Sequence, residues 1–308
     1  MLGIGDDAAV WRPSRSNLSV ITTDALIENV HFARDLMSAR DVGHRAMAAN
    51  LSDIAAMGAR PVLATIALGF PPDIDAEWVL AMYDGLVALA RTHACAIVGG
   101  DITRAPAIAI AITVVGEVRA SNLKRRADAR IGDVLAVSGP LGASRAGLEV
   151  LRSDPARAHA NGAARVVAAR VVAAYRRPEP RMREGRWFGA SRNVHALMDS
   201  SDGLATDLAR LCAASGVGAV VESVPVDPDA RAIAVQAGDD PEAYALGGGE
   251  DFELIAAIEP RAFRYLASRY RARFGRDLLR IGNVSEGSSL RFANGAPIAH
   301  SGWDHLRG

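Results

Sequence analysis

Acidic residues recur in this sequence where short apolar runs end, often beside a hydroxyl residue or a glycine. Carboxylate and hydroxyl oxygens, with no Cys and few His residues nearby, favour the hard cation Mg²⁺ over zinc. Carboxylates that are brought together repel one another unless a cation neutralises them. We therefore expect a cation site, although each residue alone could be a turn former or a helix N-cap. The set comprises Asp6, Asp7, Asp24, Asp53, Asp101, Asp199, Asp202, Glu250 and Asp251.

Asp53 has two competing interpretations. The spacing of apolar residues, Leu51 and Ile54 among them, predicts a helix over residues 41–58, and Asn50 lies one turn before Asp53 on the same face. A carboxylate on the inner side of such a helix needs a partner, and a metal ion would supply one. The alternative is that Asn50 and Asp53 form the solvated face of the helix.

Three acidic segments follow apolar runs that are typical of strands, at Thr23-Asp24, Gly100-Asp101 and residues 199–202. In open α/β sheets, ligands gather outside the carboxyl ends of the strands. The last segment, DSSDGLATDLARL, also predicts a helix with Ser201 or Asp202 as its N-cap. The unpaired amides at a helix start favour a bound phosphate, and the glycines of GGD and GGGED allow the backbone to approach a ligand closely.

The only lysine, Lys124, follows no glycine-rich loop, and no strand such as VAIK is present. The common phosphate-binding loop and the protein-kinase site both need a lysine in such a context. If this protein handles a nucleotide, it uses metal ions, arginine and backbone amides.

Strand-like and helix-like segments alternate along the chain, which predicts an α/β or α+β fold. A polar, charged segment over residues 119–132 separates two halves, and we expect domains at residues 1–130 and 131–308. The predicted strands are 18–22, 61–70, 94–98, 107–118, 133–138, 194–199, 218–222 and 252–258, followed by short strands near the end. The predicted helices are 41–58, 75–92, 143–151, 162–175, a short one after 178–181, 204–214 and 260–274.

Composition excludes several classes of protein. Lys plus Arg and Asp plus Glu number 35 each, so the formal net charge is zero and lacks the basic excess of nucleic-acid binders. No stretch approaches the ~20 apolar residues of a membrane helix, and the start, MLGIGDDAAV, has no export-signal pattern. Cys95 and Cys212 lack disulfide or zinc spacing and are expected to be buried thiols. These features fit a cytoplasmic protein.

Taken in order, the motifs resemble those of the thiamine-monophosphate kinase family, within the superfamily that includes aminoimidazole ribonucleotide synthetase. The matching stretches are GIGDDAAV, TTDALIENVHF, NLSDIAAMGA, GGDITRA, MDSSDGLATDL, GGGEDFEL and GWDHL, from residue 3 to residue 306. The resemblance implies a two-domain fold with an N-terminal sheet or half-barrel that binds ATP and Mg²⁺ and forms a homodimer, followed by a C-terminal α/β domain. It also implies transfer of the γ-phosphate of ATP to thiamine monophosphate.

The resemblance assigns roles to residues of this sequence by their place in the motifs. It implies magnesium binding at Asp7, Thr22, Thr23, Asp24, Asp53, Asp101, Asp199 and Asp202, of which Asp24, Asp53, Asp101 and Asp202 are the expected catalytic residues. It implies ATP binding at Gly100, Asp101, Arg126 and Ser201, and contacts with the thiamine substrate at His31, Glu250 and Trp303. The family's RSGA segment reads RRADA here, and Arg126 is the better match to its arginine.

Other functions stay open at this point. One alternative is another ATP-using enzyme of the same superfamily, such as aminoimidazole ribonucleotide synthetase. Selenophosphate synthetase and the hydrogenase-maturation relative would want a reactive Cys near the N-terminus and the C-terminus respectively, and neither is present. The non-enzymatic alternative is a sensor that binds a nucleotide or thiamine phosphate without turnover.

Overall fold

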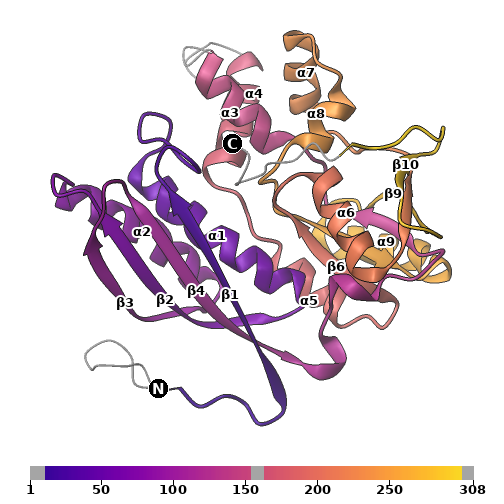
Figure 1. Ribbon diagram of the computed structural model, residues 1–308, viewed down its shortest axis with the longest axis horizontal. Coiled ribbons are helices and arrows are strands. Elements are labelled where there is room, and N and C mark those ends of the chain that lie inside the picture. Colours follow the sequence, from indigo (N-terminus) through magenta and orange to yellow (C-terminus); the bar gives the residue numbers. More distant parts are fainter. Residues whose placement is uncertain (1–10, 154–162, 300–308) are drawn as a thin grey trace.

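A computed structural model of the chain describes residues 11–153 and 163–299. Two sheets form the framework, and helices pack on both of them (Figure 1). The fold is mixed α/β, as the alternating pattern predicts. Among the described residues, no helix is both long and apolar enough to cross a membrane. Cys95 and Cys212 are buried free thiols, in agreement with the sequence.

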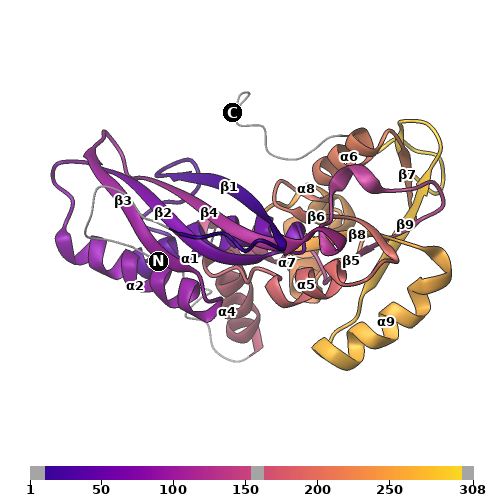
Figure 2. The ribbon, with the colours of Figure 1, turned by 90° about the horizontal axis from the view of Figure 1, so that it is seen from below.

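The first sheet has four strands in the order β1 (Asn17–Ile27), β4 (Ala109–Arg119), β2 (Arg60–Phe70) and β3 (Ala96–Arg104). Strand β4 runs antiparallel to both of its neighbours, and β2 is parallel to β3. Helices α1 (Ala39–Ala56) and α2 (Ala76–Thr92) lie on one face of this sheet (Figure 2). None of the described helices lies on the opposite face of the sheet (Figure 2).

The contact between α1 and α2 depends on two glycines. A Cβ atom on Gly43 would collide with the carbonyl of Met82, and one on Gly85 would collide with the carbonyl of Arg40. The two helix backbones therefore touch directly. This close contact fixes α1 as a rigid support for the side chains that it carries.

The second sheet has six strands in the order β10 (Leu290–Phe292), β7 (Gly218–Val221), β9 (Leu279–Ser285), β5 (Val134–Val137), β8 (Glu253–Ile258) and β6 (Val194–Ser200). All its strand pairs are antiparallel except β10 with β7. The helices of this half are α3 (Ala143–Ser153), α4 (Ala163–Arg176), α5 (Met182–Gly189), α6 (Leu204–Ser215), α7 (Pro228–Ala237), α8 (Pro241–Gly247) and α9 (Pro260–Phe274).

The segment between the two sheets contains the short helices η1 (Ala120–Asn122) and η2 (Arg126–Asp128). Between them, the buried Lys124 donates hydrogen bonds from Nζ to the carbonyls of Ser191 (2.8 Å) and Val194 (2.7 Å). The single lysine of the chain is thus a structural tie to the second sheet. The domain boundary at residues 130/131 falls just after η2 and stays a prediction.

Each predicted strand and helix has a counterpart in the structure, but two expectations are wrong. Asp24 and Asp101 lie within β1 and β3 rather than at strand ends, because each strand runs several residues further than predicted. The predicted strand ended before Gly99 and Gly100, whereas β3 continues through them. A Cβ on Gly100 would collide with the carbonyl of Ile66 on β2, so close strand contact accounts for this glycine. Helices α7 and α8 were not predicted.

Candidate active site

Helix α1 brings its polar residues against strand β1. Thr22 Oγ1 donates a hydrogen bond to Asp53 Oδ2, and Asn50 Oδ1 accepts one from the backbone N–H of Asp24 (3.1 Å). Asn50 is fully buried, so the interpretation of this face as solvated is wrong. Burial raises the pKa of Asp53, while the Thr22 hydroxyl and the nearby charge of Arg126 oppose that rise.

The second sheet adds a carboxylate to the same place. Asp199, near the end of β6, is buried, and its Oδ2 accepts a hydrogen bond from Ser52 Oγ on α1 (2.7 Å). Burial raises the pKa of Asp199 to about 8, and the charges of Asp53 and, more weakly, Asp24 add to the effect. Asp24, Asp53 and Asp199, from β1, α1 and β6, are therefore close enough for their charges to interact.

No described group of three or more His, Cys, Asp or Glu side chains meets the geometry of a ready-formed metal site. Burial is the main cause of the raised pKa values of Asp53 and Asp199, and neither carboxylate forms an ion pair with a described cationic side chain that would offset it. A cation beside two such carboxylates would favour their ionised forms at neutral pH. The junction of α1, β1 and β6 is therefore poised to take up positive charge.

Asp207, in the first turn of α6, holds the loop that follows β6. Asp207 Oδ2 accepts hydrogen bonds from the backbone N–H groups of Ser201 and Asp202, both 2.9 Å. The predicted N-cap is wrong, because α6 begins after Gly203, whose φ of 107° few other residues adopt, and no described side chain caps it. Arg210 forms ion pairs with Asp202 and Asp207.

Glu250 lies beside this loop and is paired with α1. Its N–H donates to the carbonyl of Ser201 (2.7 Å), and its carboxylate forms an ion pair with Arg45. The side chain of Arg45 is only 1 % exposed, lies over the ring of Tyr175 at 4.4 Å and donates to that residue's carbonyl. Glu250 has a φ of 65°, so this arrangement holds an uncommon backbone conformation.

Other predicted site residues lie apart from this junction. Side chains alternate along a strand, so Thr22 and Asp24 face α1 whereas Thr23 faces the open side of the sheet. Asp101 is exposed on the edge strand β3, in one row with Ala67, which also faces the open side. Within one chain, the structure therefore does not bring Thr23 or Asp101 to Asp53.

His31 follows β1, and its Nδ1 accepts a hydrogen bond from the backbone N–H of Ile27 (3.0 Å). The predicted residues Asp7 and Trp303 lie outside the described residues. Arg126 begins η2, and its charge acts on Asp53. Ser201 follows β6, two residues after Asp199.

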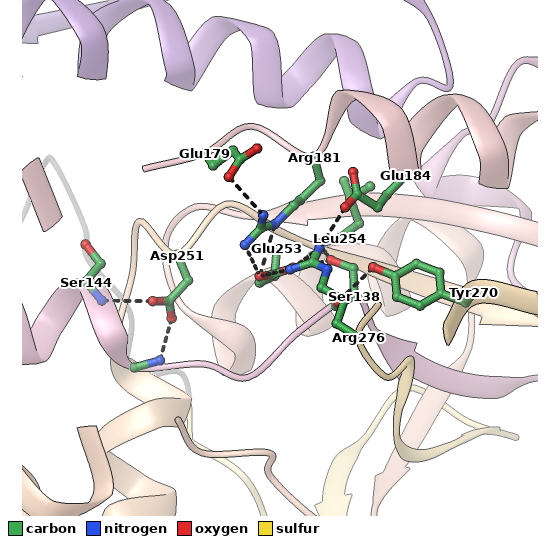
Figure 3. Close-up of polar contacts among 11 residues, drawn as sticks. Ser138, Ser144, Glu179, Arg181, Glu184, Asp251, Glu253, Leu254, Tyr270 and Arg276 are labelled. Carbon is green, nitrogen blue, oxygen red and sulfur yellow. Dashed lines mark hydrogen bonds and ion pairs between the residues drawn. The ribbon is translucent and has the colours of Figure 1, made fainter. Parts of the chain in front are cut away.

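A second group of buried charges lies around Glu253 (Figure 3). Its carboxylate forms ion pairs with Arg181 (2.6 Å) and Arg276 (3.1 Å) and accepts a hydrogen bond from Ser138. Burial alone would raise the pKa of Glu253, but the two arginine charges outweigh it and the pKa lies below its ordinary value. Nearby, Asp251 accepts hydrogen bonds from the N–H groups of Gly142 (2.6 Å) and Ser144 (3.0 Å).

Comparison with known proteins identifies the family. Residues 5–118 match the family "AIR synthase related protein, N-terminal domain", and residues 130–292 match "AIR synthase related protein, C-terminal domain". A thiamine-monophosphate kinase from Synechococcus elongatus is 36 % identical over 269 residues, which cover 83 % of this chain and 77 % of the relative. This chain belongs to the thiamine-monophosphate kinase family.

Solved structures agree with this assignment. The thiamine-monophosphate kinase from Stenotrophomonas maltophilia K279a superposes with a TM-score of 0.86 at 35 % identity, covering 97 % of this chain and 92 % of that one. The structure of AaThiL complexed with AMPPCP and TMP superposes with a TM-score of 0.82 at 30 % identity, covering 96 % and 89 %. The predicted resemblance to thiamine-monophosphate kinases is confirmed.

Sequence reasoning missed four residues that hold the candidate site of this thiamine-monophosphate kinase family member. They are Arg45, Ser52, Asp207 and Arg210. Ser52 and Asp207 stand inside the quoted motifs NLSDIAAMGA and MDSSDGLATDL, so a polar residue on an otherwise apolar helix face was the available signal. Arg45 had no such signal, because its partners lie far away in the sequence.

Proposed function

We propose that this protein transfers the γ-phosphate of ATP to thiamine monophosphate and forms thiamine diphosphate, with Mg²⁺ as the required cation. Membership of the thiamine-monophosphate kinase family supports the reaction. A relative's complex with AMPPCP and TMP supports the choice of both substrates. The observation that carries the cation requirement is the pair of the half-buried Asp53 and the buried Asp199, whose pKa values are raised by burial and which form no ion pair with a described side chain.

The residues present fit Mg²⁺. The carboxylates at the junction offer oxygen donors, the ligands that Mg²⁺ prefers, and neither Asp53 nor Asp199 forms an ion pair with a described side chain. Bound there, Mg²⁺ would supply charge neutralisation and orientation for two phosphate-bearing substrates. The residues that would hold it at the junction are Asp24, Asp53, Asp199 and Asp202, with the hydroxyl of Thr22. The motifs also imply Asp7, Thr23 and Asp101 as ligands, and because Thr23 and Asp101 face the open side of the first sheet, these two would act away from the junction.

The chain's own residues prepare this site by holding the carboxylates in place. Thr22 fixes Asp53, Ser52 fixes Asp199, and Asn50 fixes the backbone of β1 at Asp24. The nucleophile would be a phosphate oxygen of thiamine monophosphate, which is already ionised near neutral pH because the second phosphate pKa is ~6. No general base is needed, so positioning and charge neutralisation carry the catalysis.

The remaining assigned residues bind the substrates in this proposal. Arg126, Gly100, Asp101 and Ser201 hold ATP, and the uncapped start of α6 next to Ser201 offers amide groups to a phosphate. His31, Glu250 and Trp303 contact the thiamine substrate. The position of Glu250 next to the Ser201 carbonyl supports a common site for both substrates.

The open face of the first sheet supports a homodimer as part of the proposal. The described helices cover the other face (Figure 2), and Ile21 (68 % exposed) and Ile27 (40 % exposed) stand on the open face among alanines and threonines. Light scattering should give a dimer mass, and Ile21→Asp should shift it to a monomer. Val166→Asp, at an equally exposed position on α4, is the control and should leave the dimer intact. A monomeric wild type at micromolar concentration would contradict the dimer.

The test of the reaction is a product assay. Purified protein with ATP, thiamine monophosphate and millimolar Mg²⁺ should form thiamine diphosphate, detected by chromatography, and EDTA should abolish product formation. Free thiamine should be a poor acceptor, because it lacks the ionised phosphate. Folded protein that consumes ATP only with a different acceptor would favour another enzyme of the superfamily. Protein that binds both ligands without turnover would be a sensor.

We also propose a cytoplasmic location, where ATP and thiamine phosphates are available. Cell fractionation of the organism, with antibody detection of the protein, would test it, and recovery in the membrane or secreted fraction would contradict it.

A further inference from the structure

One guanidinium group bridges two carboxylates at the edge of the candidate site. Arg210 on α6 contacts Asp202 Oδ2 and Asp207 Oδ1, the latter at 3.1 Å, and both contacts come from the same nitrogen, Nη1. The other oxygen of Asp207 holds the backbone N–H groups of Ser201 and Asp202. We call Asp202, Asp207 and Arg210 the α6 clamp.

The three members of the α6 clamp differ in their access to solvent. The side chain of Asp207 is fully buried, that of Asp202 is 21 % exposed and that of Arg210 is 45 % exposed. Asp207 is fixed by two amides and by its place on the helix, whereas Asp202 and Arg210 can separate into solvent. The contact between Asp202 and Arg210 is therefore the part of the clamp that can exchange partners.

We propose that Arg210 is a resident counter-cation of Asp202, which a divalent cation must displace in order to bind. The inference rests on the proposed function, because it takes Asp202 as a metal ligand. In the absence of metal, Arg210 neutralises Asp202 and Asp207 and keeps the 199–202 loop in place. When metal binds, Arg210 leaves Asp202 and keeps its contact with Asp207. Arg210 is thus a positioning residue that weakens metal binding at this carboxylate.

A purely structural ion pair would behave differently. Removing it would lower stability by the same amount with and without metal, and metal affinity would not rise. A resident counter-cation competes with the metal, so removing it should strengthen metal binding while it weakens only the metal-free protein. These two outcomes are separable without measuring catalysis.

The first experiment titrates the full chain with Mn²⁺ in the absence of nucleotide and measures the concentration of free Mn²⁺ by electron paramagnetic resonance. Mn²⁺ accepts the same oxygen ligands as Mg²⁺. Arg210→Gln should bind Mn²⁺ about fivefold more tightly, the upper range for a partly exposed ion pair. Arg210→Lys keeps the charge and should stay near wild type. Arg271→Gln is the control. Arg271 lies on α9 and forms an exposed ion pair with Asp277, so this change removes the same charge elsewhere.

The second experiment compares melting temperatures. In EDTA, Arg210→Gln should melt below wild type, because Asp202 and Asp207 are left to repel each other, and saturating Mg²⁺ should close most of the gap. Unchanged or weaker Mn²⁺ binding in Arg210→Gln, or a melting gap that Mg²⁺ leaves intact, would overturn the role of Arg210. A wild type that binds no Mn²⁺ would overturn the metal site of the proposed function as well. If Arg271→Gln raised the Mn²⁺ affinity equally, the effect would come from the change in net charge alone, and the inference would also be overturned.

Discussion

Asp199 and Glu253 stand one register step apart on the neighbouring strands β6 and β8, and their side chains point to opposite faces of the second sheet. Both carboxylates are buried. Glu253 meets Arg181, Arg276 and the Ser138 hydroxyl, and its pKa is lowered (Figure 3). Among the described side chains, Asp199 accepts a hydrogen bond from the Ser52 hydroxyl and lies near other acids, and its pKa is raised to about 8.

The difference separates a structural carboxylate from a functional one. A buried charge costs several kcal/mol unless it is paired, so a fold that pairs one carboxylate twice and leaves its neighbour unpaired retains the second for a ligand. Asp251 falls between these cases, since two backbone amides hold it and burial still raises its pKa to about 7. Both carboxylates are buried, so pairing with arginine is what makes the pKa of Glu253 differ from that of Asp199.

The largest expected effect concerns Glu253, the carboxylate that is paired with two arginines. Glu253→Gln keeps the shape of the side chain but leaves Arg181 and Arg276 without their shared carboxylate, which should cost about 3 kcal/mol of unfolding free energy. Urea denaturation measures this, and added Mg²⁺ should not restore it. The control Glu222→Gln removes an exposed partner of Arg280 and should cost less than ~1 kcal/mol. A stable Glu253→Gln protein would show that the network contributes little.

The next largest effect concerns Asp53, which lies beside Asp199 at the proposed cation site. Asp53→Asn keeps an oxygen for the Thr22 hydroxyl but removes a charge from the proposed cation site, and turnover should fall by ~10²-fold or more. The melting temperature in EDTA should stay the same or rise, because repulsion with Asp199 is relieved. The control Asp75→Asn alters the N-cap of α2, where Asn caps equally well, and should change neither quantity. Unchanged turnover of Asp53→Asn at limiting Mg²⁺ would remove Asp53 from the site.

The sequence predicted one side of this comparison and not the other. Apolar periodicity predicted the helix that carries Asp53, with its inner face as one of two interpretations, and the segment DSSDG placed Asp199 at the end of a strand. The partners of Glu253 are 72 and 23 residues away, at the start of α5 and after α9, so no local pattern connects them. Pairing of this kind follows from tertiary packing alone.

Two features of the fold could have been predicted from signals that are present. Helices α7 and α8 both begin with Asp followed by Pro, at Asp227-Pro228 and Asp240-Pro241, which is the N-cap and first-turn pattern of a helix. The strand ends at Asp24 and Asp101 were placed wrongly because polar residues and glycines also occur within sheet edges. Residue type alone does not separate an edge strand from a turn.

The raised pKa of Asp199 predicts a pH effect on the metal-free protein. The folded state retains a proton that the unfolded state releases near pH 4, so the stability in EDTA should fall as pH rises from about 4 to about 8 and then level off. Saturating Mg²⁺ should flatten this slope, because the metal binds the ionised form. Urea denaturation at several pH values measures it. Asp199→Asn should make the slope in EDTA shallower, and the remaining slope should come from Asp53, Asp207 and Asp251, whose pKa values are raised as well. A wild type whose stability is constant across this range would contradict the assignment.

The smallest expected effect concerns Ser52, the one described hydroxyl that donates to Asp199. Ser52→Ala removes a donor that lowers the pKa of Asp199, so the pKa should rise further and a metal must displace a more tightly held proton. Mg²⁺ affinity, measured by calorimetry, should fall about fivefold at pH 7, in proportion to the ~1 kcal/mol of one hydrogen bond, and the difference should shrink at pH 9.

Ser200 provides the matched control for Ser52. It is buried next to Asp199 in the chain, and its hydroxyl has no hydrogen-bond partner among the described residues. Ser200→Ala therefore removes the same group without removing a donor to the carboxylate, and Mg²⁺ affinity should stay at the wild-type value at both pH values. An equal loss in both variants would indicate that packing around β6, rather than the Ser52 hydrogen bond, sets the affinity. A loss confined to Ser52→Ala that vanishes at pH 9 would show that the protein tunes the proton on Asp199 through this hydroxyl, since Ser200→Ala carries every other effect of the change in pH.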